Sequence, residues 1–209
     1  DPWPHFRGGP SQTGVAPECT LAATLAPAWT FETQGPVVSS AVVDAGGRVF
    51  VGSEDGHLYA LSLDRGQKVW AFAAGAPIEA APTLIGDLVV VGTTDGTLYG
   101  VDSRTGKQRW FYHTEGKILG AANAVSRPDG GTTVVVGSYD GKLHGLDART
   151  ATPLWTYVTE NYVHASPTVA AGQVLVGGCD GHVHVISASG EPVRKVKVGG
   201  QVGGSVGVP

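Results

Sequence analysis

The alternation of apolar and polar residues along the chain repeats itself around four Asp-Gly pairs. In residues 51–61, apolar residues flank Asp55-Gly56 on both sides. An Asp-Gly pair in such a setting predicts a β-hairpin, because both residues tolerate the positive φ angles that a tight primed turn needs. The pattern returns at residues 91–101, 136–146 and 176–186, around Asp95-Gly96, Asp140-Gly141 and Asp180-Gly181.

A second column of the repeat lies fifteen residues after each aspartate. Three copies place a tryptophan there, Trp70, Trp110 and Trp155, and the fourth places Lys195. The aspartates are 40, 45 and 40 residues apart, and repeats of about 40 to 45 residues are typical of β-propeller blades. The sequence therefore predicts an all-β fold, a β-propeller of four-stranded antiparallel blades.

The repeat divides the chain into a lead-in and a partial propeller. Prolines are frequent in residues 1–28 and predict an irregular lead-in, held by Trp3 and Phe6. Residues 29–209 are expected to form the partial propeller, and Trp29 resembles the tryptophans of the later fourth strands. About four blades of an expected seven or eight are present, so further blades are needed to close the ring. The expected parts are a closing strand at 29–36, blades at about 37–76, 77–116, 117–161 and 162–200, and the start of a fifth blade at 201–209.

Composition and charge give no reason to expect nucleic acid as a partner. The 209 residues carry a formal net charge of −4 and only 15% charged residues, whereas a nucleic-acid surface needs a concentrated basic patch. The basic run at residues 194–197 is interpreted as one solvated strand face. No run of 18 apolar residues occurs, so no transmembrane segment is predicted. Cys19 and Cys179 are the only cysteines, and a disulfide between them stays open.

The residues that most resemble reactive groups belong to the repeat itself. An aspartate in every copy is interpreted as a turn residue, because catalysis needs one site and not four equivalent ones. His182 and His184 share one face of a predicted strand, but two histidines without a third ligand do not make a metal site. We therefore predict no catalytic, cofactor-binding or metal-binding residue. Structural roles are expected for Trp29, Trp70, Trp110, Trp155, Asp55, Gly56, Asp95, Gly96, Asp140, Gly141, Asp180 and Gly181.

The segments that lead into each inner strand differ from blade to blade while the framework columns stay constant. In a propeller these segments approach the central channel, and binding residues are found where a scaffold carries variable positions. We expect a protein or peptide partner to bind there. The polar and aromatic candidates are Glu79, Lys117, Asn161, Tyr162 and His164.

The chain resembles the pyrroloquinoline-quinone-type (PQQ-like) β-propeller repeat family. The resemblance lies in Val-Gly-Ser/Thr-x-Asp-Gly-x-Leu-Tyr, in residues 104–110 and in the opener at residues 3–8. This family includes quinoprotein alcohol dehydrogenases and the outer-membrane-protein assembly lipoprotein BamB, and many members bind no quinone. The resemblance implies that the fourth-strand tryptophans dock between blades. It also implies a bacterial, periplasmic or extracellular location, with or without a lipid anchor.

Two functions follow as hypotheses. The first is a non-catalytic exported scaffold that binds a protein or peptide through its loops and channel mouth, without a cofactor. The alternative is a fragment of a PQQ-dependent quinoprotein dehydrogenase, in which the family's quinone and calcium would sit in the central channel. The resemblance implies an Asp base, a Trp floor and adjacent cysteines for such an enzyme, and no pair of adjacent cysteines is present in this sequence.

Overall fold

The computed structural model describes residues 2–16 and 24–208, and its regular structure there is entirely β. The strands form four antiparallel sheets of four strands, each in sequence order, which confirms the predicted all-β fold of four-stranded blades. Blade one contains β1 (Val42–Val43), β2 (Arg48–Gly52), β3 (His57–Ser62) and β4 (Lys68–Ala73); blade two β5 (Thr83–Ile85), β6 (Leu88–Gly92), β7 (Thr97–Asp102) and β8 (Gln108–His113); blade three β9 (Asn123–Ser126), β10 (Thr132–Gly137), β11 (Lys142–Asp147) and β12 (Pro153–Val158); blade four β13 (Thr168–Ala170), β14 (Gln173–Gly177), β15 (His182–Ser187) and β16 (Pro192–Lys197).

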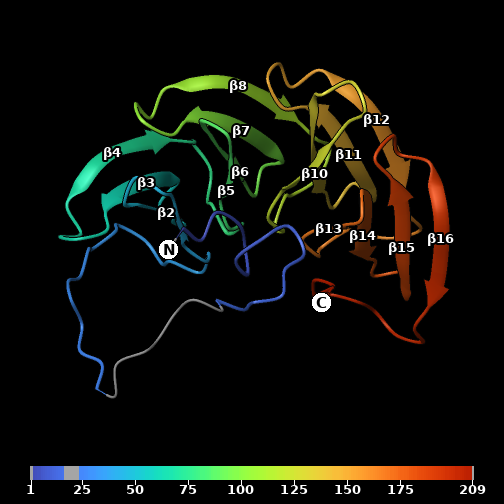
Figure 1. Ribbon diagram of the computed structural model, residues 1–209, viewed down its shortest axis with the longest axis horizontal. Coiled ribbons are helices and arrows are strands. Elements are labelled where there is room, and N and C mark those ends of the chain that lie inside the picture. Colours follow the sequence, from blue (N-terminus) through green and yellow to red (C-terminus); the bar gives the residue numbers. More distant parts are fainter. Residues whose placement is uncertain (1, 17–23, 209) are drawn as a thin grey trace.

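The blades are arranged as an open arc, with the first strand of each blade toward the centre and the fourth strand outside (Figure 1). The middle strands of blades two and three are buried on both faces, because each face packs against a neighbouring blade. In β6 every residue is buried, and its alternate side chains contribute to two different core clusters, Val90 toward blade three and Val89 toward blade one. A strand that is covered on both faces needs a continuous apolar run, and Leu88-Val89-Val90-Val91 supplies it.

The Asp-Gly pairs form hairpin turns, but not the primed turns that we predicted. Only the glycines have positive φ angles, between 78° and 89°, and none of the four aspartates does. The N–H of Gly56 donates to the carbonyl of Ser53 at 3.1 Å, which is a type I turn followed by a glycine bulge. The prediction overlooked the carboxylate, because Asp55 Oδ1 accepts the N–H of His57 at 3.0 Å and this bond stabilises the wider turn.

Each tryptophan of a fourth strand docks on the following blade. The indole N–H of Trp70 donates to the carbonyl of Ser103 at 3.1 Å, and Trp110 bonds Ala148 at 3.0 Å in the same way. Trp155 repeats the contact with Ala188 at 3.0 Å, and Trp29 reaches Leu63 of blade one at 2.8 Å.

Our placement of Lys195 in the tryptophan column was wrong. Trp110 pairs with Gly100, and the corresponding pair in blade four joins Arg194 to Val185. The turn between β15 and β16 is one residue shorter than its counterparts, which a fixed count of fifteen residues could not detect. Lys195 lies on the opposite face, where its ammonium group is 2.7 Å from Glu160.

The predicted closing strand at residues 29–36 is not a strand. Trp29 and Phe31 pack on Val49, Tyr59 and Leu61 of blade one, but the segment has no ladder partner in the described part of the chain. A strand needs a neighbour for its backbone hydrogen bonds, so the missing neighbour explains the difference. Val37 shows the same opening, because it is 47% exposed whereas its counterparts Ile78, Ile118 and Val163 are fully buried.

Candidate functional site

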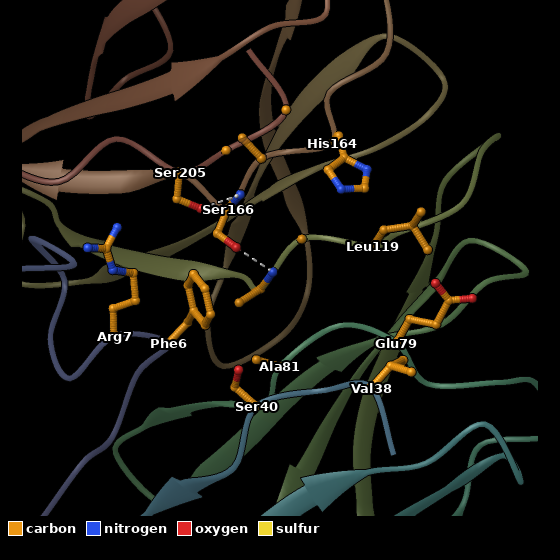
Figure 2. A pocket seen from close by; sticks show the side chains of 15 residues that line it. Phe6, Arg7, Val38, Ser40, Glu79, Ala81, Leu119, His164, Ser166 and Ser205 are labelled. Atoms are coloured by element: carbon orange, nitrogen blue, oxygen red, sulfur yellow. Dashed lines mark hydrogen bonds between the residues drawn. The ribbon is translucent and has the colours of Figure 1, made fainter. Parts of the chain in front are cut away.

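A pocket with a cavity volume of about 260 Å³ lies at the centre of the arc (Figure 2). Most of its wall consists of two layers of residues. Each lead into an inner strand contributes one residue to each layer. We call the pocket the channel cup. The upper layer is Val38, Glu79, Leu119, His164 and Gly203, and the lower layer is Ser40, Ala81, Ala121, Ser166 and Ser205.

The leads of blades two, three and four hold these residues by the same contact. The N–H of Ile78 donates to the carbonyl of Ser53 at 3.1 Å, and Ile118 and Val163 repeat the bond to Thr93 and Ser138. The aliphatic side chain is then buried against a glycine at which a Cβ would lie within 2.5 Å of it, as Ile78 is against Gly52. Because side chains alternate along an extended chain, the next residue faces the channel. This alternation places Glu79 and His164 in the cup.

Residues 3–12, which we call the N-terminal strap, cross the inner strands and reach all the blades. Trp3 exchanges two backbone hydrogen bonds with Val43 of blade one, at 2.8 and 2.9 Å. The N–H groups of Leu84 in blade two and Val169 in blade four donate to the carbonyls of Pro4 and Pro10.

The strap reaches blade three and the last described residues by further bonds. Asn123 Nδ2 of blade three donates to the carbonyl of Pro10 at 2.9 Å, and the N–H of Val208 donates to the carbonyl of Ser11 at 3.0 Å. The inner strands are the channel edges of their sheets, so the strap satisfies backbone groups that an open channel would leave to water. The lead-in that we expected to be held by two aromatic residues is thus held by backbone pairing.

The strap places Phe6 and Arg7 in the wall of the channel cup. Arg7 has a φ of 57° and Gln12 a φ of 53°, a left-handed conformation that costs a non-glycine residue about 1–3 kcal/mol. The surrounding bonds hold both residues there. The N–H of Gly14 donates to the carbonyl of Arg7 at 3.0 Å, and the side chain of Gln12, 2% exposed, donates to Pro167 at 2.8 Å.

An aromatic cluster lies beside His164 at the rim of the cup. Tyr139 Oη is 2.7 Å from His164 Nδ1, and the ring of Tyr139 stacks on Tyr162 at a centroid distance of 5.0 Å. Burial raises the pKa of Tyr139. Sequence reasoning missed Tyr139, because its column also holds Glu54, Thr94 and Cys179 and gave no sign of a contact with the next blade.

The remaining candidates lie outside the cup. Lys117 is exposed, and its backbone carbonyl accepts the N–H of Tyr139 at 2.9 Å. Asn161 uses its side chain locally, since Oδ1 accepts the N–H of Tyr162 at 2.8 Å and Nδ2 donates to the carbonyl of Cys179 at 3.4 Å. The structure therefore brings Glu79 and His164 into the cup, joins Tyr162 to them through Tyr139, and leaves Lys117 and Asn161 apart.

Two Asp-His-Tyr chains resemble catalytic groups but are inter-blade contacts. In the first, His144 Nε2 is 2.9 Å from Asp140 and its Nδ1 is 3.1 Å from Tyr112 of blade two. The second joins Asp180, His184 and Tyr157 in the same way. His144 and His184 are at most 3% exposed, so no substrate reaches them, and burial lowers the pKa of His144.

The residues described by the structure contain no group of three His, Cys, Asp or Glu side chains that could hold a metal ion. The described lining of the cup contains a single carboxylate, Glu79, and we derive no chemistry from a calcium-bound quinone. Cys179 forms no disulfide with a described residue, and Cys19 lies outside the described residues. No helix in the described part of the chain is long and apolar enough to cross a membrane.

The blades, the docked tryptophans and the cup define a β-propeller arc with a central pocket. Comparison with known families agrees with the repeat motif: the family model described as outer membrane protein assembly factor BamB matches residues 21–137 and 125–196. The chain belongs to this family of PQQ-like β-propeller repeat proteins.

Solved structures and curated proteins add relatives at lower similarity. BamB from Moraxella catarrhalis is 26% identical with a TM-score of 0.65, over 76% of this chain and 48% of that chain. The computationally designed Ika8 protein, 20% identical with the same TM-score over 76% of this chain and 49% of its own, shows the fold alone. Lupanine 17-hydroxylase [cytochrome c] from Pseudomonas sp. is 40% identical over 57 residues, which are 27% of this chain and 8% of the hydroxylase. The chain thus spans about half of the solved relatives.

Proposed function

We propose that this chain is part of a non-catalytic propeller scaffold that binds a protein or peptide partner at the mouth of its channel. The observation that carries the proposal is the channel cup. One repeated backbone contact holds the leads that carry Glu79, Leu119 and His164, yet the upper layer presents a different side chain from each of them, and Val38 adds another from blade one. A constant frame with variable side chains at a concave surface is the arrangement that binding proteins use.

The family relationship supports the same reading. The matching family model is described as an assembly factor for outer membrane proteins, a role that implies protein partners. By the same analogy we propose that the protein is exported to the periplasm or the extracellular space. An outward location agrees with the opener Trp3-Pro4-His5-Phe6-Arg7-Gly8, which is similar to the mature N-termini of secreted members.

A photo-crosslinking experiment tests the proposed binding surface. A benzophenone amino acid is placed at His164 in the cup and, as a matched control, at Phe111 on the outer strand β8, where the side chain is 61% exposed. On irradiation in cells, position 164 should give a discrete crosslinked species that contains a partner protein, and position 111 should not. Equal yields at both positions, or no crosslink at 164, would contradict binding through the channel mouth.

A fragment of a quinone-dependent dehydrogenase is the second candidate, and the similarity to a lupanine hydroxylase favours it. The test is to incubate the purified protein with pyrroloquinoline quinone and Ca²⁺ and to follow lupanine-dependent reduction of cytochrome c. Sustained reduction would contradict the scaffold proposal and support the dehydrogenase. If there is no reduction and the desalted protein shows no quinone absorbance, the result supports the scaffold proposal.

A further inference from the structure

Two residues of opposite charge, Arg7 and Glu79, line the channel cup and are unpaired in the described structure. Figure 2 shows Arg7 and Phe6 on one side of the pocket and Glu79 with Leu119 on the other. Neither Arg7 nor Glu79 forms an ion pair or a side-chain hydrogen bond with any residue that the structure describes, although other exposed charges, such as Lys142 with Glu115, do pair. A pocket with separated, unpaired charges of both signs favours a ligand with both signs.

The position of Arg7 is fixed by the fold. Its left-handed backbone, with φ at 57°, is held between Gly8, whose N–H donates to His5 at 3.0 Å, and Gly14, whose N–H donates to Arg7 itself. The strap bonds to Leu84 and Val169 anchor both sides of this turn. Strained backbone that the surroundings maintain points to a functional position, and a guanidinium group is well suited to a carboxylate, which it can bind through two parallel hydrogen bonds.

The side of Glu79 suits a cation. Glu79 is exposed and lines the cup together with His164, whose Nδ1 is 2.7 Å from Tyr139 Oη. Tyr139 and Tyr162 are stacked with an interplanar angle of 12°, and Tyr162 is 53% exposed. The carboxylate attracts a Lys or Arg side chain by charge, and the exposed ring of Tyr162 at the rim is an acceptor for a cation–π contact.

The size and lining of the cup favour a piece of polypeptide. Its volume of about 260 Å³ is below the range of roughly 300–1,000 Å³ that is usual for small-molecule sites. The lower layer of Ser and Ala side chains leaves room for an inserted chain, while Phe6, Val38 and Leu119 provide apolar contact.

We propose that the channel cup binds an extended peptide segment that carries one acidic and one basic side chain, with the acidic group at Arg7 and the basic group at Glu79. This inference rests on the proposed function and names the class of segment that the scaffold would take. The strap is therefore part of the binding site as well as a brace of the fold.

Labelled synthetic peptides and fluorescence anisotropy test the inference with the purified protein. The probes contain one Asp and one Lys separated by one, two or three serines, in both orders, and the matched neutral probes contain Asn and Gln. At least one charged probe should bind about tenfold more tightly than its neutral match, and the difference should shrink as salt is raised. Arg7→Gln should remove the preference for Asp over Asn, and Glu79→Gln the preference for Lys over Gln.

Controls separate charge recognition from folding. Arg104→Gln and Glu191→Gln change exposed charges outside the cup and should leave binding unchanged, and each variant should keep the unfolding midpoint of the parent. The double variant Arg7→Glu with Glu79→Arg should bind its charged probe in the reversed orientation. If peptide binding does not depend on these charges but a crosslink forms at position 164, the inference is overturned and the proposed function is still supported. If no peptide binds and no crosslink forms, both are overturned.

Discussion

Trp110 packs at the interface between blade two and blade three. It is 7% exposed and lies in a core cluster with Leu98, Val134 and Ala151. At Gly100, a Cβ would lie 2.1 Å from the indole ring, so the strand opposite the indole can carry no side chain there.

Trp110→Ala should lower the free energy of unfolding by about 3–5 kcal/mol, as other truncations of large core residues do. The measurement is urea denaturation followed by circular dichroism. Phe111→Ala, the next residue along β8 and 61% exposed, is the control and should change stability by less than about 0.5 kcal/mol. A loss below about 1 kcal/mol for Trp110→Ala would mean that the indole contributes little to the interface.

His144 should make the stability of the fold depend on pH. Burial lowers the pKa of His144 in the folded protein below the usual value of 6.5, more than the nearby Asp140 raises it. Below about pH 6.5 the unfolded chain therefore binds a proton that the folded chain does not, so stability is present at neutral pH and is lost as pH falls. Arg109 holds the pKa of Asp102 well below its usual range, so the contribution of that carboxylate is lost only at lower pH.

Denaturation at pH 7.5, 6.5 and 5.5 measures this dependence. A single histidine contributes a slope of at most about 1.4 kcal/mol per pH unit. The double variant Tyr112→Phe with His144→Tyr reproduces the Phe72–Tyr99 pair that joins blades one and two. It should show a smaller slope of stability against pH than the parent. His5, whose pKa is also lowered by burial, remains in the variant and keeps part of the slope. An unchanged slope would show that His144 does not titrate with folding.

Individual site residues could be inferred from the sequence only where the repeat exposes them as exceptions. Glu79 and His164 stand out because their column is otherwise Val38, Leu119 and Gly203. Tyr139 did not, because its partner His164 lies 25 residues away in the next blade and no period of the repeat joins the two columns. Arg7 lies outside every repeat, so only the strap geometry brings it to the cup.

At the scale of strands, the same position in each third strand carries an aromatic ring that contacts an aromatic residue from the segment before that blade. Blade one and blade two present Tyr59 and Tyr99, which meet Phe31 and Phe72 at centroid distances of 5.3 and 5.2 Å. In the later blades the third-strand residue is a histidine and its fourth-strand partner is a tyrosine, at 5.6 and 5.5 Å. One hydroxyl group is thus present in each pair, on one side or the other.

A double-mutant cycle on Tyr112 and His144 tests this complementarity. His144→Tyr alone should destabilise the protein, because two phenol groups then compete for one buried site. Adding Tyr112→Phe should recover most of the loss, because the result is the same Phe–Tyr pair as Phe72 and Tyr99. The cycle, measured by denaturation at pH 7.5, should give a favourable coupling of about 0.5–3 kcal/mol; purely additive effects would show that the two residues do not depend on each other.

The hairpins themselves could be predicted because Asp-Gly and period-two alternation act within a few residues. The type of turn could not be predicted. The hydrogen bond that the N–H of His57 donates to Asp55 favours the wider turn over the primed turn, and the two turns differ little in energy. The register of β16 was missed for a related reason. A one-residue deletion in the β15–β16 turn moves Arg194 to the face where the other blades carry tryptophan.

At the scale of the whole molecule, the arc leaves blade faces without a neighbour. Val183 is only partly buried, although its counterparts Leu58, Leu98 and Leu143 are fully buried. At the other end Val37 is 47% exposed. The repeat period predicted this arc, but it carries no information on the blades that would adjoin it.

A polypeptide limited to residues 1–209 should self-associate, because exposed apolar faces of adjoining strands favour contact between copies. Sedimentation velocity should show species larger than the 21.4 kDa monomer. Val183→Lys, on the uncovered face of blade four, should reduce the association, whereas Thr105→Lys on an exposed turn should not. A monodisperse monomer with one cooperative melting transition would contradict the expectation.

The N-terminal strap also bears on the order in which the fold is assembled. Gln12 bonds Pro167, which is 155 positions further along the chain, so the end of the strap that carries Gln12 cannot complete its contacts until blade four has formed. Contacts of such long sequence separation form late in folding, and a chain synthesised from its N-terminus completes its early blades first. The end of the strap that carries Gln12 is therefore made before the blades but reaches its native position only after blade four has formed.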